Sequence, residues 1–222
     1  MPIDTKWVCD QVDKVAGMHL IDIGSFDGNI TKLLSATFPD SSVHSIEADP
    51  TNFKFLRKSC KGVANIICHN VAIGQCNCDT EMYIMKHRKY NGLTSQSNSL
   101  YKGFVAGKTS EYQKVVVNGM TMQQFCLANN IERIGLLKIN CEGCEYKIFK
   151  AEGLGFLRFT DVISLAMHGK ELFNEFEDNK IAINKILAKD FRCIYGQPLN
   201  SPRPAKKRWP HVLQVWKRRG MR

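Results

Sequence analysis

The chain is predicted to be an α/β protein, with a mostly parallel β-sheet covered by helices on both faces. Two observations carry this prediction. Short apolar runs rich in β-branched residues alternate with segments of helical periodicity, and a glycine-containing turn follows the first run. The length of 222 residues suits one domain with a sizeable core. Since no repeat or linker interrupts the pattern, we expect a single domain over residues 1–222.

The predicted elements follow one another in the order that this architecture requires. A strand at 19–23 precedes apolar residues at helical spacing up to Phe38, and a second strand covers 42–47. Asp49 as N-cap and Pro50 at the first helical position then begin another helix. The other predicted elements are strands at 65–69, 134–140, 162–167, 192–195 and 212–216, a short helix at 121–128, and a long helix carrying Leu172, Phe173, Phe176, Ile183, Ile186 and Leu187.

An insertion after the third strand breaks this alternation. It covers about 80–118 and contains two further predicted strands, 81–85 and 114–117, on either side of a long polar loop. We therefore expect a β-hairpin at this point of the chain.

The composition indicates an ordinary globular protein. Hydrophobic residues make up 44% of the chain and charged residues 23%. No apolar run approaches the roughly 20 residues that span a bilayer, and the N-terminus lacks the apolar core of a secretory signal. We expect a protein that is not secreted and does not bind membranes, located in the cytoplasm or, as the alternative, in the nucleus.

Positive charge is concentrated near the C-terminus. The net charge is +10, and residues 201–222 contain eight Lys and Arg but no acidic residue. In the predicted sheet, the basic loop and tail at 198–222 begin on the side where ligands bind, and so does the insertion. An anionic substrate such as RNA would suit two basic loops beside one cleft, although a solvated loop or a nuclear import signal is the alternative. The substrate-binding candidates are Arg88, Lys206, Lys207 and Arg208.

The nine cysteines do not form a recognisable framework. Cys141 and Cys144 have the spacing of a zinc knuckle or a redox pair. A zinc site needs four ligands, usually in two such pairs, and the only other close pair, Cys76 and Cys78, is separated by a single residue. We therefore expect no metal site and no redox pair, with the cysteines serving as small, partly buried apolar residues.

The first turn, "IDIGSFDGN" at 21–29, indicates a nucleoside site. A dinucleotide site would need glycine two residues after Gly24, where the chain has the bulky Phe26, and no P-loop lysine follows. The turn therefore suits a ligand with adenosine but no phosphate, the alternative being a tight structural turn. Asp22 is placed to face the cationic amino-acid part of S-adenosylmethionine.

Glu47, at the end of the second strand, strengthens this prediction. It follows Gly24 by 23 residues, and an acid there can accept hydrogen bonds from both ribose hydroxyls. Each such bond contributes roughly 1.5–3 kcal/mol. Further cofactor-binding candidates are Gly24, Ser25, Phe26 and Gly28 in the turn, and Asn70, which follows the third strand and is expected to border the adenine.

Several blocks of the sequence resemble the FkbM family of S-adenosylmethionine-dependent methyltransferases. The most specific block is Lys-x-x-x-Glu-Gly-x-Glu, formed by Lys138, Glu142, Gly143 and Glu145. The matching segments are "LIDIGSFDGN" at 20–29, "IEADPTNFKFL" at 46–56, "NVAIG" at 70–74, "VNGMTMQQF" at 117–125, "LLKINCEGCEYKIFKAEG" at 136–153 and "ISLAMHG" at 163–169. The resemblance implies a seven-stranded, mostly parallel Rossmann-like sheet, S-adenosylmethionine as cofactor, and methylation of a hydroxyl oxygen on a small molecule, a sugar or an RNA ribose.

The ends of the fourth and fifth strands supply the catalytic candidates, because ligands bind at the carboxyl edge of such sheets. His168 is the expected general base, with a structural histidine as the alternative. Asn140 is expected to hydrogen-bond the substrate or the methionine end of the cofactor. Lys138 is costly to bury alone, so Glu142 or Glu145 is its expected partner.

Two departures from the family pattern define an alternative function. The family usually has Asp where this chain has Asn140, and often an acid where it has Ala166. The loss of both acids is compatible with a catalytically silent relative that binds a nucleoside or RNA.

Overall fold

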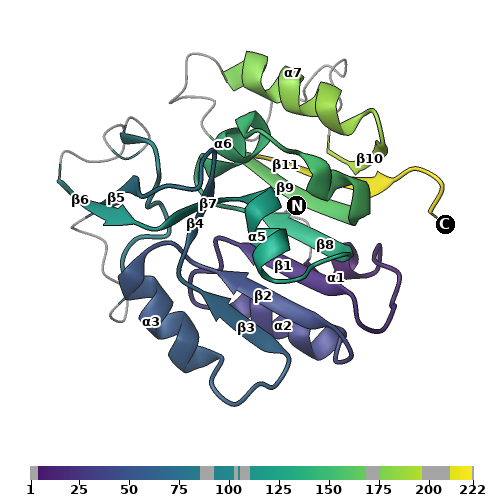
Figure 1. The fold of residues 1–222 in the computed structure, drawn as a ribbon, viewed down its shortest axis with the longest axis horizontal. Coiled ribbons are helices and arrows are strands. Elements are labelled where there is room, and N and C mark those ends of the chain that lie inside the picture. The colour runs from purple at the N-terminus through teal and green to yellow at the C-terminus, as the bar shows by residue number, and fades with distance from the viewer. Residues whose placement is uncertain are drawn as a thin grey trace, which may run out of the picture.

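The core of the molecule is a seven-stranded sheet with the strand order β10-β11-β9-β8-β1-β2-β3 (Figure 1). Neighbouring strands are parallel except β11, which is antiparallel to both β9 and β10. The strands are β1 (His19–Ile23), β2 (Ser42–Ile46), β3 (Ile66–His69), β8 (Ile134–Ile139), β9 (Thr160–His168), β10 (Phe191–Tyr195) and β11 (His211–Arg218). The predicted mostly parallel sheet is therefore confirmed. The structure, a computed structural model, describes residues 5–85, 93–102, 105, 111–168, 176–196 and 211–221.

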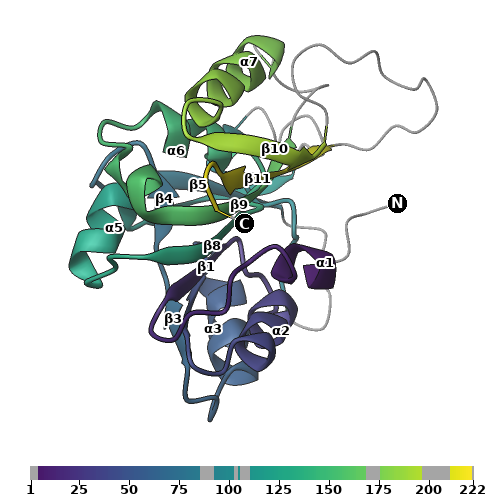
Figure 2. The same ribbon diagram turned by 90° about the vertical axis from the view of Figure 1, so that its right-hand side faces the viewer.

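Helices cover both faces of this sheet (Figure 2). Because side chains alternate along a strand, Leu20 of β1 packs with Leu34 on one face, while Ile21 belongs to the core on the other face with Phe125. The helices are α1 (Thr5–Cys9), α2 (Asn29–Thr37), α3 (Pro50–Ser59), α5 (Met122–Ala128), α6 (Cys144–Lys150) and α7 (Phe176–Leu187), with a 3₁₀ turn, η1 (Gly155–Phe159). In the described segments, no helix has the length and apolar character needed to cross a membrane.

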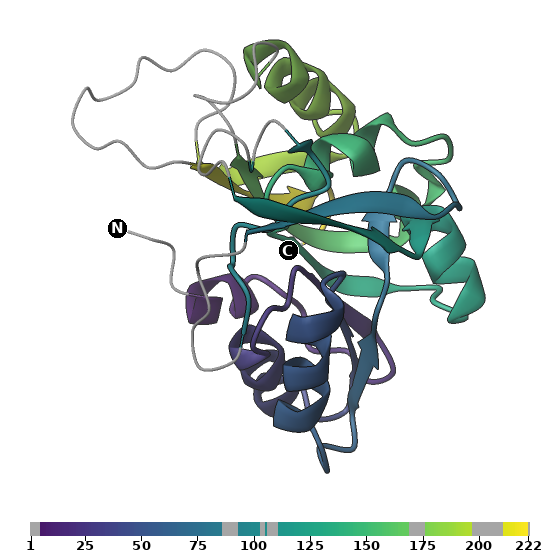
Figure 3. The same ribbon diagram turned by 90° about the vertical axis from the view of Figure 1, so that its left-hand side faces the viewer.

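The insertion after β3 forms the expected hairpin on the side of the molecule shown in Figure 3. Strands β5 (Thr80–Met85) and β6 (Tyr112–Val117) pair antiparallel. A short parallel pair that the sequence did not predict, β4 (Ala72–Gly74) with β7 (Gly119–Thr121), connects this hairpin to the rest of the chain. Strands of three residues are too short to show a periodic pattern.

The helix starts differ in how well the sequence marks them. The Asp49 side chain accepts hydrogen bonds from the backbone N–H groups of Thr51 and Asn52, which confirms it as the N-cap of α3. In contrast, α6 was not predicted, because Gly143 precedes it without a capping side chain. Helix α7 begins at Phe176, and the residues Leu172 and Phe173 assigned to it lie outside the described ranges.

Three histidines form a hydrogen-bonded row across the first three strands. Nδ1 of His19 lies 2.9 Å from Nε2 of His44, and Nδ1 of His44 lies 3.0 Å from Nε2 of His69. Burial, together with repulsion from the two flanking rings, lowers the pKa of His44 to about 3, and burial lowers the pKa of His19 and His69. The rings are therefore neutral near pH 7, and each contact is an N–H···N hydrogen bond that connects neighbouring strands.

Candidate active site

The turn between β1 and α2 brings two strand ends into direct contact. Gly24 has a φ of 79°, and a Cβ atom at this position would overlap the carbonyl oxygen of Asn140 at the end of β8. The backbone N–H of Asn140 donates to the carbonyl oxygen of Ile23 at 3.0 Å. Phe26 also has a positive φ, of 49°. Only glycine fits at position 24, both for its backbone conformation and for the space beside it.

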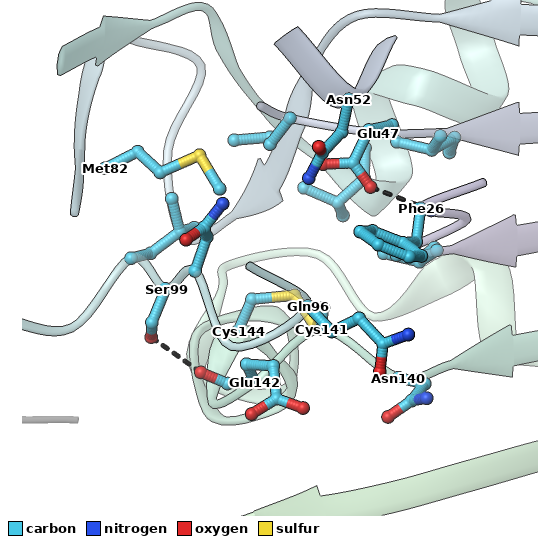
Figure 4. Close-up of a pocket in the computed structure, with 18 of the residues that line it drawn as sticks. Phe26, Glu47, Asn52, Met82, Gln96, Ser99, Asn140, Cys141, Glu142 and Cys144 are labelled. Carbon is cyan, nitrogen blue, oxygen red and sulfur yellow. Dashed lines mark hydrogen bonds between the residues drawn. A yellow bond between two sulfur atoms is a disulfide. The ribbon is translucent and has the colours of Figure 1, made fainter. Parts of the chain in front are cut away.

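Glu47 closes the other side of this turn. Its Oε2 accepts a hydrogen bond from the backbone N–H of Phe26 at 2.9 Å (Figure 4). Its Oε1 accepts one from the backbone N–H of Asp49, also at 2.9 Å. Burial raises the pKa of Glu47 to about 7, although these two donors act in the opposite direction. Each carboxylate oxygen keeps acceptor capacity for a further donor.

Glu47 lies in a first pocket, which also reaches β4 and the start of α6 (Figure 4). Its walls come from the ends of β1, β2 and β8 and from a segment of the insertion, residues 93–100, which includes Gln96. The described lining residues are Ile23, Gly24, Phe26, Ile46, Glu47, Ala48, Asn52, Val71, Ala72, Ile73, Met82, Ser95, Gln96, Asn98, Ser99, Leu100, Asn140, Cys141, Glu142 and Cys144. We call this cavity the first pocket throughout.

Hydrogen bonds anchor the segment 93–100 against the rest of the first pocket. Asn98 Nδ2 donates to Asp49 Oδ2 at 2.7 Å, and Thr94 Oγ1 donates to the same oxygen. At the other end, Ser99 Oγ donates to the backbone carbonyl oxygen of Glu142 at 2.6 Å. Sequence reasoning missed these residues, since it identified Asp49 only as a helix cap and treated the insertion as an irregular polar loop.

A second pocket of about 310 Å³ adjoins the first. The two share lining residues from three parts of the chain: the turn with Gly24 and Phe26, Gln96 of the insertion, and Asn140 with Glu142. The other lining residues of the second pocket are Thr5, Val8, Ser25, Asp27, Ile30, Leu34, Leu136, Lys138, Ile139, Ser164, Ala166 and Leu213. The two pockets therefore meet at the carboxyl ends of β1 and β8.

Lys138 pairs with Asp22, not with Glu142 or Glu145 as the sequence had led us to expect. The Lys138 Nζ lies 2.6 Å from Asp22 Oδ1, and Asp22 is fully buried. The other carboxylate oxygen of Asp22 accepts a hydrogen bond from Thr31 Oγ1 at 2.8 Å. The reason is the strand register, which places Asp22 of β1 directly beside Lys138 of β8.

Asp22 was expected to face the amino-acid part of the cofactor. In the structure it is fully buried and is not among the lining residues of either pocket. Lys138, in contrast, lines the second pocket. The charge of Asp22 therefore acts on this pocket through Lys138.

His168 lies between two carboxylates. Its Nε2 is 3.2 Å from Glu142 Oε1, and its Nδ1 is 3.1 Å from Glu145 Oε1, which also accepts the backbone N–H of His168 at 2.7 Å. Burial by itself lowers the pKa of His168, but attraction to Glu145 and Glu142 outweighs it and raises the pKa to about 9. A pKa of about 9 makes the ring an imidazolium at neutral pH, which does not favour the expected role of His168 as general base.

Two other predicted residues, Ser25 and Gly28, support the site from outside the first pocket. Ser25 Oγ donates to the carbonyl oxygen of Asp22 at 2.8 Å and accepts the backbone N–H of Ile46, and Ser25 also lines the second pocket. A Cβ at Gly28 would lie 2.8 Å from Leu56 Cδ1 of α3, so Gly28 serves helix packing.

Asn70 was expected to border the adenine, but its side chain hydrogen-bonds to the backbone that follows β2. Its Nδ2 donates to the carbonyl oxygens of Glu47 and Ala48, at 2.8 Å and 3.1 Å, and it does not line the first pocket. The predicted basic residues Arg88, Lys206, Lys207 and Arg208 lie outside the described residues.

The close cysteine pairs are disulfides, which corrects the expectation that they are separate apolar residues. Cys141 is bonded to Cys144, and Cys76 to Cys78. The turn that leads into α6 brings the Cα atoms of Cys141 and Cys144 to 5.4 Å, within the range for a disulfide. Within the described ranges, no group of three or more His, Cys, Asp or Glu side chains is arranged to hold a metal ion.

The strand order and the glycine turn opposite an acid define an open α/β sheet of the Rossmann-like class, with its site at the carboxyl ends of the strands. Solved methyltransferase structures share this fold. The Methyltransferase FkbM domain model matches residues 22–193, and the chain belongs to that family. This confirms the family resemblance and S-adenosylmethionine as the cofactor.

Three solved structures illustrate the shared fold. A putative rRNA-methylase from Clostridium thermocellum is 8% identical, with 98% of each chain covered and a TM-score of 0.51. The fibrillarin pre-rRNA processing protein of Methanococcus jannaschii is 13% identical, with 95% of this chain and 70% of that chain covered and a TM-score of 0.51. SMU.1697c, a putative methyltransferase from Streptococcus mutans in complex with SAH, is 11% identical, with 96% and 94% covered and a TM-score of 0.50. No curated protein is a significant sequence match.

Proposed function

We propose that this methyltransferase methylates a hydroxyl oxygen, on a small molecule, a sugar or an RNA ribose. The observation that carries the proposal is the position of Glu142. Glu142 lines both pockets, and His168 donates to its carboxylate. A carboxylate beside both pockets can accept the proton of a hydroxyl group that binds there.

The lining of the first pocket suits the adenosine part of S-adenosylmethionine. The missing Cβ at Gly24 lets the end of β8 approach the turn closely, and the two oxygens of Glu47 have acceptor capacity for the two ribose hydroxyls. In the second pocket, Lys138 uses one of its three N–H donors on Asp22. The remaining two are available to a carboxylate such as that of the methionine part.

Methyl transfer requires the protein to position the acceptor against the methyl group and to accept one proton. The bound cofactor supplies an electrophilic methyl group. Asn140 borders both pockets and is suited to orient the acceptor hydroxyl, and Glu142 accepts its proton. The His168 imidazolium, fixed by Glu145, keeps the carboxylate of Glu142 turned toward it. This arrangement needs neither Asp at position 140 nor an acid at position 166, which argues for catalysis and against a silent binding module.

Transfer of a labelled methyl group into total cell extract tests the proposal. The extract is separated into RNA, protein and small molecules after incubation with labelled S-adenosylmethionine. We expect label in the RNA or the small-molecule fraction, as an ether-linked methyl group that nucleoside or sugar analysis identifies. For an RNA acceptor, the product is expected to be a 2′-O-methyl nucleoside, and binding should weaken steeply as salt increases.

Changing Lys206, Lys207 and Arg208 to Ala is expected to weaken RNA binding further and to reduce its salt dependence. A methyl group found on nitrogen would contradict the proposed acceptor. Binding of the cofactor without transfer to any fraction would support the silent module.

A further inference from the structure

The disulfide between Cys141 and Cys144 encloses the residue that we assign as the base. The bond closes a ring that contains only Glu142 and Gly143 between the two cysteines, and both cysteines line the first pocket (Figure 4). Glu142 has a φ of 55° and Gly143 a φ of 105°. The left-handed region costs a non-glycine residue roughly 1–2 kcal/mol. The covalent ring therefore holds Glu142 in a conformation that its own backbone disfavours.

Glu145 connects the disulfide to His168. Its Oε2 lies 3.5 Å from Cys141 Sγ and accepts the backbone N–H of Gly143 at 3.0 Å, while its Oε1 faces His168. If the disulfide is reduced, the S–H group of Cys141 becomes a donor to Glu145. Reduction would then weaken the attraction between Glu145 and His168, because the new S–H donor competes for the carboxylate. It would also release Glu142 from the covalent ring.

We propose that Cys141 and Cys144 form a redox-active site, a dithiol–disulfide pair that exchanges with small thiol–disulfide couples of the glutathione type and thereby sets the position of Glu142. The effect on catalysis rests on the proposed function, because it acts through Glu142 as the base. The disulfide form is the active one, since in that form Glu142 faces both His168 and the pockets.

The accessibility of the two sulfur atoms sets the order of the exchange. Cys144 is 3% exposed, whereas Cys141 is partly exposed, so a small thiolate attacks Sγ of Cys141. The S–S bond breaks, and its electron pair leaves on Cys144 Sγ, which takes up a proton. A second small thiolate attacks the mixed disulfide and releases Cys141 as a thiolate, which also takes up a proton. Two electrons have passed to the protein, and the small molecule leaves as its own disulfide.

The chain offers a matched control in its second disulfide. Cys76 and Cys78 lie on the exposed segment between β4 and β5, and neither lines the first or the second pocket. Reduction of this bond does not reach Glu142 or His168. A Cys76→Ser/Cys78→Ser variant therefore separates general effects of the redox buffer from those of the proposed site.

The test follows the imidazole of His168 by NMR in protein equilibrated with oxidised or with reduced glutathione. A His168→Gln variant assigns the resonance, and alkylation with mass spectrometry reports the state of Cys141 and Cys144. We expect reduction to lower the pKa of His168 by at least about half a unit. Affinity for S-adenosylhomocysteine should change by less than about threefold.

Two double variants show whether a change in the His168 titration comes from Cys141 and Cys144 or from another effect of the buffer. The Cys141→Ser/Cys144→Ser variant should show the lower His168 pKa in both buffers, and the Cys76→Ser/Cys78→Ser variant should respond like the unchanged protein. The proposal is overturned if the His168 titration is the same in both buffers although the pair has changed state, or if the pair does not change state. Methyl transfer by a Glu142→Gln variant would show that Glu142 is not the base, and this outcome is separate from the His168 titration, which uses protein that keeps Glu142.

Discussion

Changing Glu142 to Gln is expected to lower the rate of methyl transfer by about 10²- to 10⁴-fold, the usual contribution of a general base. The amide keeps the shape of the side chain and its place between the pockets but cannot accept the hydroxyl proton. Affinity for S-adenosylmethionine should stay within about threefold of the original, because the amide leaves the walls of both pockets in place. Single-turnover transfer into the acceptor fraction and calorimetry measure the two quantities.

Glu81→Gln is the matched control for this variant. Glu81 is an exposed residue of β5 that pairs with Lys114, and it lines neither pocket. It should transfer methyl groups at the original rate. Full activity in the Glu142→Gln protein would remove the base from the proposed mechanism and leave only binding and orientation.

Changing Gly24 to Ala is expected to destabilise the protein by more than about 3 kcal/mol and to abolish measurable cofactor binding. The new methyl group would overlap the carbonyl oxygen of Asn140, and it would sit on a backbone with a φ of 79°. The ends of β1 and β8 must then separate, which widens the place where the two pockets meet. Chemical denaturation and calorimetry with S-adenosylhomocysteine measure the two effects.

The Gly62→Ala variant is the control that separates the overlap with Asn140 from the cost of a positive φ. Gly62 has a similar φ of 85°, but a Cβ there would meet nothing within 4 Å. This variant should lose roughly 1–2 kcal/mol and bind the cofactor normally. If the two variants are equally stable and both bind the cofactor, the close approach of Gly24 to Asn140 is not needed for stability or for cofactor binding.

Residues that act within their own segment could be predicted from the sequence. The N-cap role of Asp49 follows from its position before Pro50, and the position of Glu47 follows from the end of the apolar run that forms β2. Both depend on local backbone geometry. The overall sheet could be predicted for the same reason, since each strand and helix has its own periodic pattern.

Contacts between distant segments could not be predicted, because they depend on register and on neighbouring charges. The pairing of Asp22 with Lys138 requires the register of β1 against β8. The charge on His168 depends on Glu145, which a helix without a sequence signal brings beside it. The segment 93–100 closes the first pocket through hydrogen bonds to Asp49, a residue more than forty positions earlier.

In the proposed site, the ionised Glu47 holds the ribose of the cofactor. Hydroxyl groups donate to the ionised form, so binding lowers the pKa of Glu47 from its value of about 7. Affinity is therefore highest above this pKa and is lost as the pH falls through it. S-adenosylhomocysteine suits the test because, without the sulfonium charge, its own amino group titrates above this range.

Calorimetric titration of S-adenosylhomocysteine into the unchanged protein and into Glu47→Ala, across this pH range, is the decisive measurement. For the unchanged protein we expect the dissociation constant to rise by up to about tenfold between about pH 8 and about pH 6. Glu47→Ala should bind about 10- to 100-fold more weakly at the higher pH and show no such dependence. Equal affinity in both proteins, with a flat pH profile, would contradict the proposed site.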